Sequence, residues 1–352
     1  MEAKNLQKWE SELNVCIRCA YCFEGCPVFK ELGWESDGAR GKIILSYGLF
    51  TGELEPSQYI VDKIFECTFC KDCVERCSAD VSVPDILTAA RADLIENGFK
   101  YEEHEELLEK IEATGNIFGK ELKAPARSGE VPVLLGCRLK ERREDAERYL
   151  EILEKLGIKP LVVEDETCCG MPQGVLGYKD RLKKQMDKFR KRFPYEDFIC
   201  MCTTCVFFIN KAYPDLNPTY IIEEIYKRLP AHNPKKLGIK LTYHDPCNVS
   251  RGMDMVGEPR EILDWIGVEL IEMEKHGKET FCCGGGGGVL VTNKELSDKL
   301  AKTRYQQAID TGVDTLVTLC PTCELNLRNA SDRDGGKVKV KNLLDLIWEA
   351  LR

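Results

Sequence analysis

Cys282-Cys283-Gly284, an adjacent cysteine pair followed by a glycine, lies in the middle of the stretch that decides this fold. Cys247 precedes the pair, at the end of the sequence His244-Asp245-Pro246-Cys247, and Cys320-Pro321-Thr322-Cys323 closes the stretch. Thiolates are strong ligands of zinc, of copper(I) and of the iron in iron–sulfur clusters. Five cysteines in one such stretch therefore predict a metal cluster.

The same order of cysteines occurs once more, earlier in the chain. Cys137 stands alone, Cys168-Cys169-Gly170 contains the adjacent pair, and Cys202-Thr203-Thr204-Cys205 closes the set. The spacing between these cysteines is similar in both stretches. The sequence therefore contains an internal repeat of about 110 residues.

Composition limits the function further. The 352 residues include 50 basic and 59 acidic side chains, a net charge of −9 that does not suggest a nucleic-acid-binding surface. No apolar run approaches the roughly 18 residues that span a bilayer, so any membrane association is expected to come through a partner. Nineteen cysteines in clustered spacings, without an export signal, favour metal binding over disulfides and predict a cytoplasmic location.

Two more cysteine runs, Cys16 to Cys26-Pro27 and Cys67 to Cys77, have the iron–sulfur spacing of bacterial ferredoxins. In that arrangement, three cysteines of one run and the fourth of the other bind each cubane 4Fe–4S cluster. A pair of zinc sites is the alternative, but zinc ribbons have no use for a third evenly spaced cysteine. The predicted ligands are Cys16, Cys19, Cys22 and Cys77 for cubane 1, and Cys26, Cys67, Cys70 and Cys73 for cubane 2.

Hydrophobic patterning gives the fold class. Residues 84–97 have helical spacing and end at Gly98, whereas from residue 131 short apolar runs alternate with helical segments. We expect a mainly helical two-cluster ferredoxin domain followed by two repeated α/β cysteine-rich domains with parallel sheets. Ligands of such sheets collect beyond the carboxyl ends of the strands. The predicted bounds are 1–100 for the ferredoxin domain, 101–130 for a linker, and 131–230 and 231–352 for the cysteine-rich domains.

The glycine run from Gly284 to Gly288 is not followed by Gly-Lys-Ser or Gly-Lys-Thr, which argues against a nucleotide-binding loop. We interpret these glycines as backbone that approaches a cluster closely and whose amides can donate to its sulfurs. The candidate cofactor-binding glycines are Gly170, Gly284, Gly285 and Gly286.

The chain resembles heterodisulfide reductase over nearly its full length, because a ferredoxin module precedes two repeats that each contain Cys-Cys-Gly. It looks like the fused iron–sulfur catalytic subunit of that family, the D subunit, in which each complete repeat binds a noncubane 4Fe–4S cluster. The resemblance therefore implies two noncubane clusters in addition to the two cubanes. Their implied ligands are Cys137, Cys168, Cys169, Cys202 and Cys205 in the first site, and Cys247, Cys282, Cys283, Cys320 and Cys323 in the second.

Single residues near these sites have open interpretations. Cys200 is the one cysteine left over, and a buried core position is expected for it in preference to ligation. His244 could supply protons, although a hydrogen bond that orients a ligand is the simpler role. Lys140 or Arg251 could pair with an anionic group of a substrate, with ordinary surface charge as the alternative.

The resemblance implies that the two noncubane sites split the disulfide of coenzyme M and coenzyme B into two thiols while the cubanes deliver electrons. Similar repeats also occur in iron–sulfur subunits of lactate, glycolate and glycerol-3-phosphate dehydrogenases and in sulfite-reduction complexes. An electron-transfer subunit that serves a quinone or cytochrome is therefore the alternative function. The expected partners are other redox subunits, such as a flavin, hydrogenase, formate dehydrogenase or membrane cytochrome subunit.

Overall fold

A computed structural model describes residues 1–352, and the contacts between residues group the chain into two compact units. Unit 1 consists of Met1–Leu108, Pro172–Lys183 and Phe281–Arg304. Unit 2 consists of Glu109–Met171, Lys184–Thr280 and Tyr305–Arg352. Two short segments of the cysteine-rich repeats thus fold with the N-terminal residues, and the domain bounds given above remain predictions.

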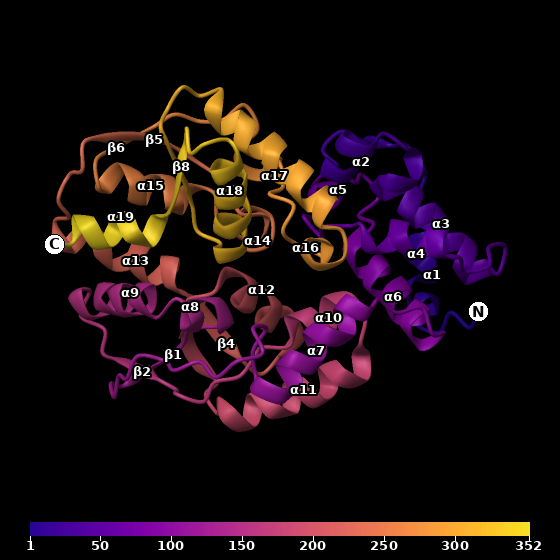
Figure 1. Cartoon of the computed structure of the whole chain (residues 1–352), viewed down its shortest axis with the longest axis horizontal. Helices are drawn as coiled ribbons and strands as arrows, with labels where there is room; N and C mark the ends of the chain where they lie inside the picture. Colours follow the sequence, from indigo (N-terminus) through magenta and orange to yellow (C-terminus); the bar gives the residue numbers. More distant parts are fainter. The chain divides into compact units, whose positions relative to one another are not determined.

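The N-terminal part of unit 1 is helical, as predicted (Figure 1). Its long helices α3 (Ala39–Thr51) and α6 (Val83–Glu96) pack against each other, and α4 (Gln58–Phe65) contacts both. Helix α6 has a proline in its first turn and is followed by Gly98 with a φ of +91°, which fits the predicted start and stop signals. The shorter helices near the cysteine runs are α1 (Glu10–Val15), α2 (Pro27–Leu32) and α5 (Asp72–Glu75).

Unit 2 contains two four-stranded sheets in which every strand pair is parallel, as predicted. The strand orders are β2-β1-β3-β4 and β6-β5-β7-β8, so the two repeats have the same topology. The strands are β1 (Val131–Leu134), β2 (Pro160–Val162), β3 (Asp197–Cys200), β4 (Asn217–Tyr220), β5 (Ile239–Tyr243), β6 (Val268–Leu270), β7 (Thr315–Thr318) and β8 (Lys339–Asn342).

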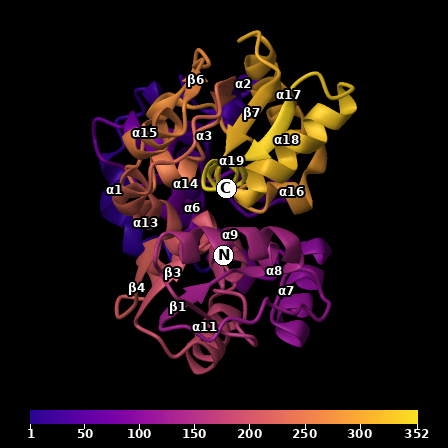
Figure 2. The same ribbon diagram turned by 90° about the vertical axis from the view of Figure 1, so that its left-hand side faces the viewer.

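Helices connect these strands and cover the sheets (Figure 2). The helices that lie wholly in unit 2 are α8 (Cys137–Glu141), α9 (Arg143–Lys155), α12 (Thr203–Ala212), α13 (Ile221–Arg228), α14 (Cys247–Ser250), α15 (Gly257–Trp265), α18 (Pro321–Arg333) and α19 (Leu343–Ala350). The remaining helices are α7 (Glu102–Thr114), α10 (Met171–Leu176), α11 (Lys179–Arg192), α16 (Val289–Thr292) and α17 (Lys294–Ile309).

The two repeats share one hydrophobic core in unit 2, which includes Leu134 and Ile222 of the first repeat and Leu263 and Ile347 of the second. Helices α9 and α19 lie side by side in both views (Figures 1 and 2). Between them, Asp345 accepts hydrogen bonds from Arg148 at 3.1 Å and from the Tyr149 hydroxyl at 3.0 Å. The repeats are therefore held together by packing and by polar contacts. No helix of the chain is both long and apolar enough to cross a membrane.

Candidate iron–sulfur sites

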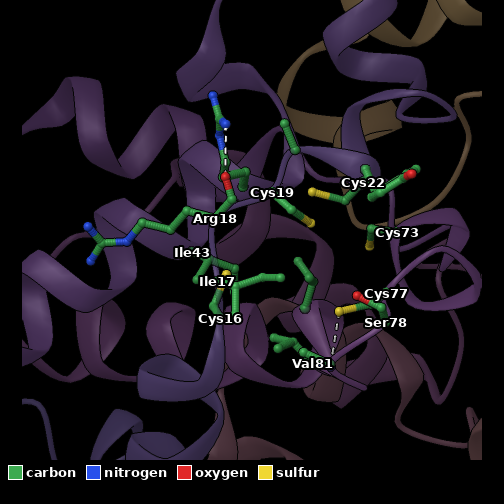
Figure 3. A pocket seen from close by; sticks show the side chains of 15 residues that line it. Cys16, Ile17, Arg18, Cys19, Cys22, Ile43, Cys73, Cys77, Ser78 and Val81 are labelled. Carbon is green, nitrogen blue, oxygen red and sulfur yellow. Dashed lines mark hydrogen bonds between the residues drawn. The ribbon is translucent and has the colours of Figure 1, made fainter.

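One cavity in unit 1 brings together the cysteines predicted to bind cubane 1. Figure 3 shows the side chains of Cys19, Cys22 and Cys77 around it. Arg18 and Ala20, on either side of Cys19, have φ values of +57° and +70°. This left-handed conformation costs about 1 to 2 kcal/mol per non-glycine residue, so the loop is held in a strained shape that curls around the cavity. The cysteines that line the cavity are Cys16, Cys19, Cys22, Cys73 and Cys77.

A second cavity in unit 1 brings together the cysteines predicted for cubane 2. Phe69 and Lys71 flank Cys70 with φ values of +54° and +65°, so this loop repeats the backbone of the first. The fourth cysteine comes from the other run, as the ferredoxin spacing predicts. The lining cysteines are Cys26, Cys67, Cys70 and Cys73. Both predicted sets are thus gathered, and their binding of iron remains a prediction.

Burial makes these thiols poor acids without metal. It raises the pKa of Cys22 to about 11 and that of Cys26 to about 12. Because iron binds thiolates, the thiols must lose their protons when a cluster binds. The iron–sulfur bonds would have to offset the free energy of that deprotonation. Two such compact groups of thiols fit two iron–sulfur clusters.

The five cysteines implied for the first noncubane site form a continuous series of thiol contacts within unit 2. The Sγ atoms of Cys169 and Cys205 are 3.5 Å apart. Cys168 contacts both Cys137 and Cys169, and Cys205 contacts Cys202. Three segments carry them. Cys137 is the first residue of α8, which follows β1, the cysteine pair directly precedes α10, and Cys202 is the N-cap of α12, which follows β3. The structure therefore brings this whole set together.

A polar cavity of about 270 Å³ opens beside Cys137. Glu166 lines it, fully buried, and accepts hydrogen bonds from the backbone N–H groups of Leu135 at 3.0 Å and Gly136 at 2.8 Å. Burial raises the pKa of Glu166 to about 7. No motif in the sequence singles out this residue. Its position two residues before the cysteine pair is the only sequence signal that could have indicated it.

Lys140 lines the same cavity, and the surface-charge interpretation of this residue is wrong. Its side chain is buried, and Nζ donates a hydrogen bond to the backbone carbonyl of Glu164 at 2.9 Å. Cys200, in contrast, lies in the core of unit 2, as predicted. Its thiol donates to the carbonyl of Cys202 at 3.5 Å.

The cysteines implied for the second noncubane site are divided between the units. Cys247 is the first residue of α14, which follows β5. Cys320 and Cys323 lie at the start of α18, which follows β7, and all three cysteines belong to unit 2. Cys282 and Cys283 belong to unit 1. The assembly of this site therefore remains a prediction.

Two basic side chains near the second set are buried. A ring nitrogen of His244 and the Sγ of Cys323 lie within 4.8 Å of each other. Arg251 donates to the carbonyls of Lys278, at 2.7 Å, and Thr280. The surface-charge interpretation of Arg251 is therefore also wrong, because its guanidinium holds the backbone that leads to the cysteine pair.

The glycine run packs against the cubane 2 loop within unit 1. A Cβ at Gly286 would collide with the carbonyl oxygen of Thr68, and one at Gly287 with that of Cys67. Arg91 ties the two segments together, since its guanidinium donates to the carbonyls of Gly287 at 2.7 Å and Cys67 at 3.1 Å. The glycines therefore allow a close approach, as expected. The neighbour that they approach is the backbone of the loop that carries Cys67, a predicted ligand of cubane 2.

The other candidate glycines have less specific surroundings. The N–H of Gly284 points to the Sγ of Cys282 at 3.4 Å, which is the kind of amide–sulfur contact expected from the sequence. Gly170 and Gly284 have positive φ values of +93° and +82°. These conformations explain why a glycine follows each cysteine pair.

Comparison with known proteins agrees with this arrangement. Residues 131–210 and 241–328 match the cysteine-rich domain family, and residues 12–81 match the 4Fe–4S dicluster domain. The chain is 30% identical to the B subunit of fumarate reductase (CoM/CoB) of Methanothermobacter marburgensis, covering 98% of this chain and 75% of that one. It is 25% identical to the D subunit of dihydromethanophenazine:CoB–CoM heterodisulfide reductase of Methanosarcina barkeri, covering 100% and 97%. It is 23% identical to the probable glycolate oxidase iron–sulfur subunit of Bacillus subtilis, covering 97% and 94%.

The fold and the matched domains define an iron–sulfur redox protein with a dicluster module and two cysteine-rich domains. Within that class, the chain belongs to the family that contains the B subunit of fumarate reductase (CoM/CoB) and the D subunit of heterodisulfide reductase. These relatives are parts of redox complexes, which supports the expectation of redox partner subunits.

Proposed function

We propose that this chain is the catalytic iron–sulfur subunit that reduces a heterodisulfide of the coenzyme M and coenzyme B type to two thiols. One observation carries the proposal: the cysteine-bearing ends of the two repeats adjoin within unit 2. The Thr203 hydroxyl, next to Cys202, donates to the carbonyl of Leu319, next to Cys320, at 3.2 Å. Helix α12 also contacts α14, which begins at Cys247. Splitting a disulfide requires two neighbouring sites, one for each sulfur.

The reaction consumes two electrons and two protons for each disulfide and releases two thiols. Four clusters, two cubane and two noncubane, would supply the electrons and bind the separated sulfurs. The chain itself contributes the polar cavity beside Cys137, which gives a small substrate access to the first site. Lys140, held by the carbonyl of Glu164, supplies a positive charge in the wall of that cavity. Glu166, which accepts hydrogen bonds from the amides of Leu135 and Gly136, has its pKa raised by burial to about 7, so its carboxyl group can exchange a proton near neutral pH.

Electrons are proposed to enter at the cubane 1 cavity, because its rim is open to solvent. Cys19 is exposed there, and the apolar side chains of Ile17 and Tyr21 are 69% and 68% exposed. Exposed apolar side chains around a redox centre suit contact with another protein. The partner would be a flavin, hydrogenase, formate dehydrogenase or cytochrome subunit, and a reducing cytoplasm remains our predicted location.

The test is oxidation of reduced viologen dye by the anaerobically purified full-length chain, with the mixed disulfide as the varied substrate. We expect disulfide-dependent oxidation that yields two thiols for every two electrons. The two symmetric disulfides serve as controls for specificity. A fully metallated chain that passes electrons to a quinone or cytochrome, but shows no disulfide-dependent oxidation, would contradict the proposal.

The second candidate is an electron-transfer subunit without a substrate of its own. The similarity to the probable glycolate oxidase iron–sulfur subunit favours it. An electron relay, however, needs a line of one-electron centres and has no evident use for two complete five-cysteine sets. The controlled dye assay separates the two functions directly.

A further inference from the structure

Lys42 is a buried lysine at the site of cubane 2. It lies in the first turn of α3, its side chain is 1% exposed, and it lines the same cavity as Cys26 and Cys67. Its Nζ has no hydrogen-bond partner. A buried ammonium group without a partner is costly, so it either loses its proton or is compensated by a negative charge nearby.

The acidic side chains near Lys42 are already engaged by another lysine. Asp37 and Glu66 are the nearby carboxylates, and Lys63 pairs with them at 2.6 Å and 3.0 Å. Burial lowers the pKa of Lys42, and the charges of Cys67 and Cys26 act against that shift. The strongest candidates to compensate Lys42 are therefore the thiolates around the cavity.

Arg91 brings a second buried positive charge to the same loop. Its side chain is 0% exposed, and its guanidinium lies over the rings of Phe65 and Phe69 at 4.7 Å and 4.4 Å. Its charge favours the thiolate of Cys67. The guanidinium hydrogen bonds go to backbone carbonyls, namely those of Ile64, Phe65, Cys67, Val175 and Gly287.

The basic residues at cubane 1 have different surroundings. Arg18 and Arg40 line that cavity, but Arg18 is exposed to solvent. Arg40 is only partly buried and pairs with Glu35 at 2.8 Å. Water and a carboxylate thus weaken the field of these charges at the cluster, whereas the charges at cubane 2 act through the protein interior.

The four thiols and the unpartnered ammonium group fit a 4Fe–4S cluster, because four thiolates leave such a cluster with a net negative charge that grows on reduction. We propose that Lys42 sets the reduction potential of the cluster held by Cys26, Cys67, Cys70 and Cys73 above that of cubane 1. This inference rests on the cubane ligand sets of the proposed function. Electrons that arrive at the exposed cluster are then drawn inward to the buried one, next to the loop that leads to Cys283.

The test is a redox titration of the full-length, anaerobically purified protein, followed by the electron paramagnetic resonance signals of the reduced cubanes. The variant Lys42→Met removes the charge and keeps a similar length. We expect one cubane signal to shift to a lower potential, by at least about tenfold in the reduction equilibrium, which is about 59 mV for one electron. Lys42→Arg keeps the charge and should leave that potential close to the wild-type value.

Arg18→Met is the matched control, because it removes a solvent-exposed charge from the other cavity. It should shift neither signal appreciably. Unchanged potentials in Lys42→Met, or equal shifts of both signals, would overturn the proposal.

Iron analysis of each variant shows whether the cluster has been lost. If Lys42→Met loses iron, Lys42→Gln is titrated in its place with the same expected shift. Loss of cubane iron in the Met, Gln and Arg variants alike would overturn the proposal in favour of a purely structural role. Because these measurements need no substrate, a chain without disulfide reductase activity can still show the shift.

Discussion

The two cysteine-rich repeats share a strand order but place their cysteine pairs differently. In the first repeat, Cys168 and Cys169 lie in unit 2 with the other three cysteines of their set. In the second repeat, Cys282 and Cys283 lie in unit 1, and Gly287 packs against the backbone of Cys67. A duplicated fold has therefore placed only its second cysteine pair in the same unit as the cubane loops.

The surroundings of the two sets also differ in chemistry. Glu166 stands two residues before the first pair, and Thr280 stands at the equivalent position before the second. Conversely, His244 stands three residues before Cys247, where the first repeat has Leu134 before Cys137. Glu166 and His244 are thus two buried ionisable groups without an equivalent in the other repeat.

The strongest test of this comparison is to remove one cysteine from each pair. Cys169→Ser and Cys283→Ser should each abolish disulfide reduction, to below about one hundredth of the wild-type rate, because one trapped sulfur leaves the other without a site. Each variant should lose about four of the roughly sixteen irons implied by four 4Fe–4S clusters. Iron and sulfide analysis with the viologen assay measures both effects.

Cys200→Ser is the matched control, since Cys200 is a buried cysteine outside both sets. It should keep the iron content and the turnover and lose only stability. Equal loss of iron in Cys200→Ser and Cys169→Ser would show that the implied ligand set of the first repeat is wrong.

A smaller effect is expected from a substitution at the contact between Gly287 and the backbone of Cys67, which has no counterpart in the first repeat. Gly287→Ala places a Cβ against the carbonyl of Cys67, whereas Gly312→Ala has a similar positive φ and open space around it. The backbone conformation alone should cost about 1 kcal/mol in each variant. Gly287→Ala should cost about 2 kcal/mol more, because the loop must move.

Denaturant unfolding under anaerobic conditions measures both glycine variants. The cubane 2 signal should also change in Gly287→Ala and stay unchanged in Gly312→Ala. Equal unfolding free energies would mean that the glycine run is not pressed against the cubane loop.

The smallest expected effect concerns pH. His104 is buried in unit 1 near Gly288, and burial lowers its pKa to about 3. The unfolded chain, with a pKa of about 6.5, binds the proton more readily, so stability falls as the pH drops below about 6.5. At pH 5.5 the loss should be about 1.4 kcal/mol.

His104→Phe keeps an aromatic ring beside Phe65 and Tyr101 and removes the titration. The unfolding free energies of both proteins are measured between about pH 5.5 and 7.5. Their difference should change with pH at the lower end of this range and become constant toward the upper end. A wild-type slope that persists in His104→Phe would assign the pH dependence to other groups.

Much of the fold could be read from local sequence. The ferredoxin spacing is local, because the backbone around Cys19 and Cys70 adopts the same turns in both runs. The strand before Cys137 is an apolar run, and the parallel sheets follow from the alternation of strands with helices. Strands β4 and β8 were not predicted; in β4, Asn217-Pro218-Thr219-Tyr220 resembles a turn. Both are edge strands, and at an edge the proline of β4 is tolerated.

The sequence by itself thus determined the class of protein and the helical and parallel α/β parts, because these depend on spacing and patterning along the chain, whereas the cysteine set of the second repeat stays a prediction. It missed helix α7, which occupies part of the predicted linker. Only the tertiary structure decided that Lys42, Arg91 and Glu166 are buried and that the glycine run packs against Cys67. The physical reason is that the burial of a charge depends on side chains far away in sequence, which no local pattern records.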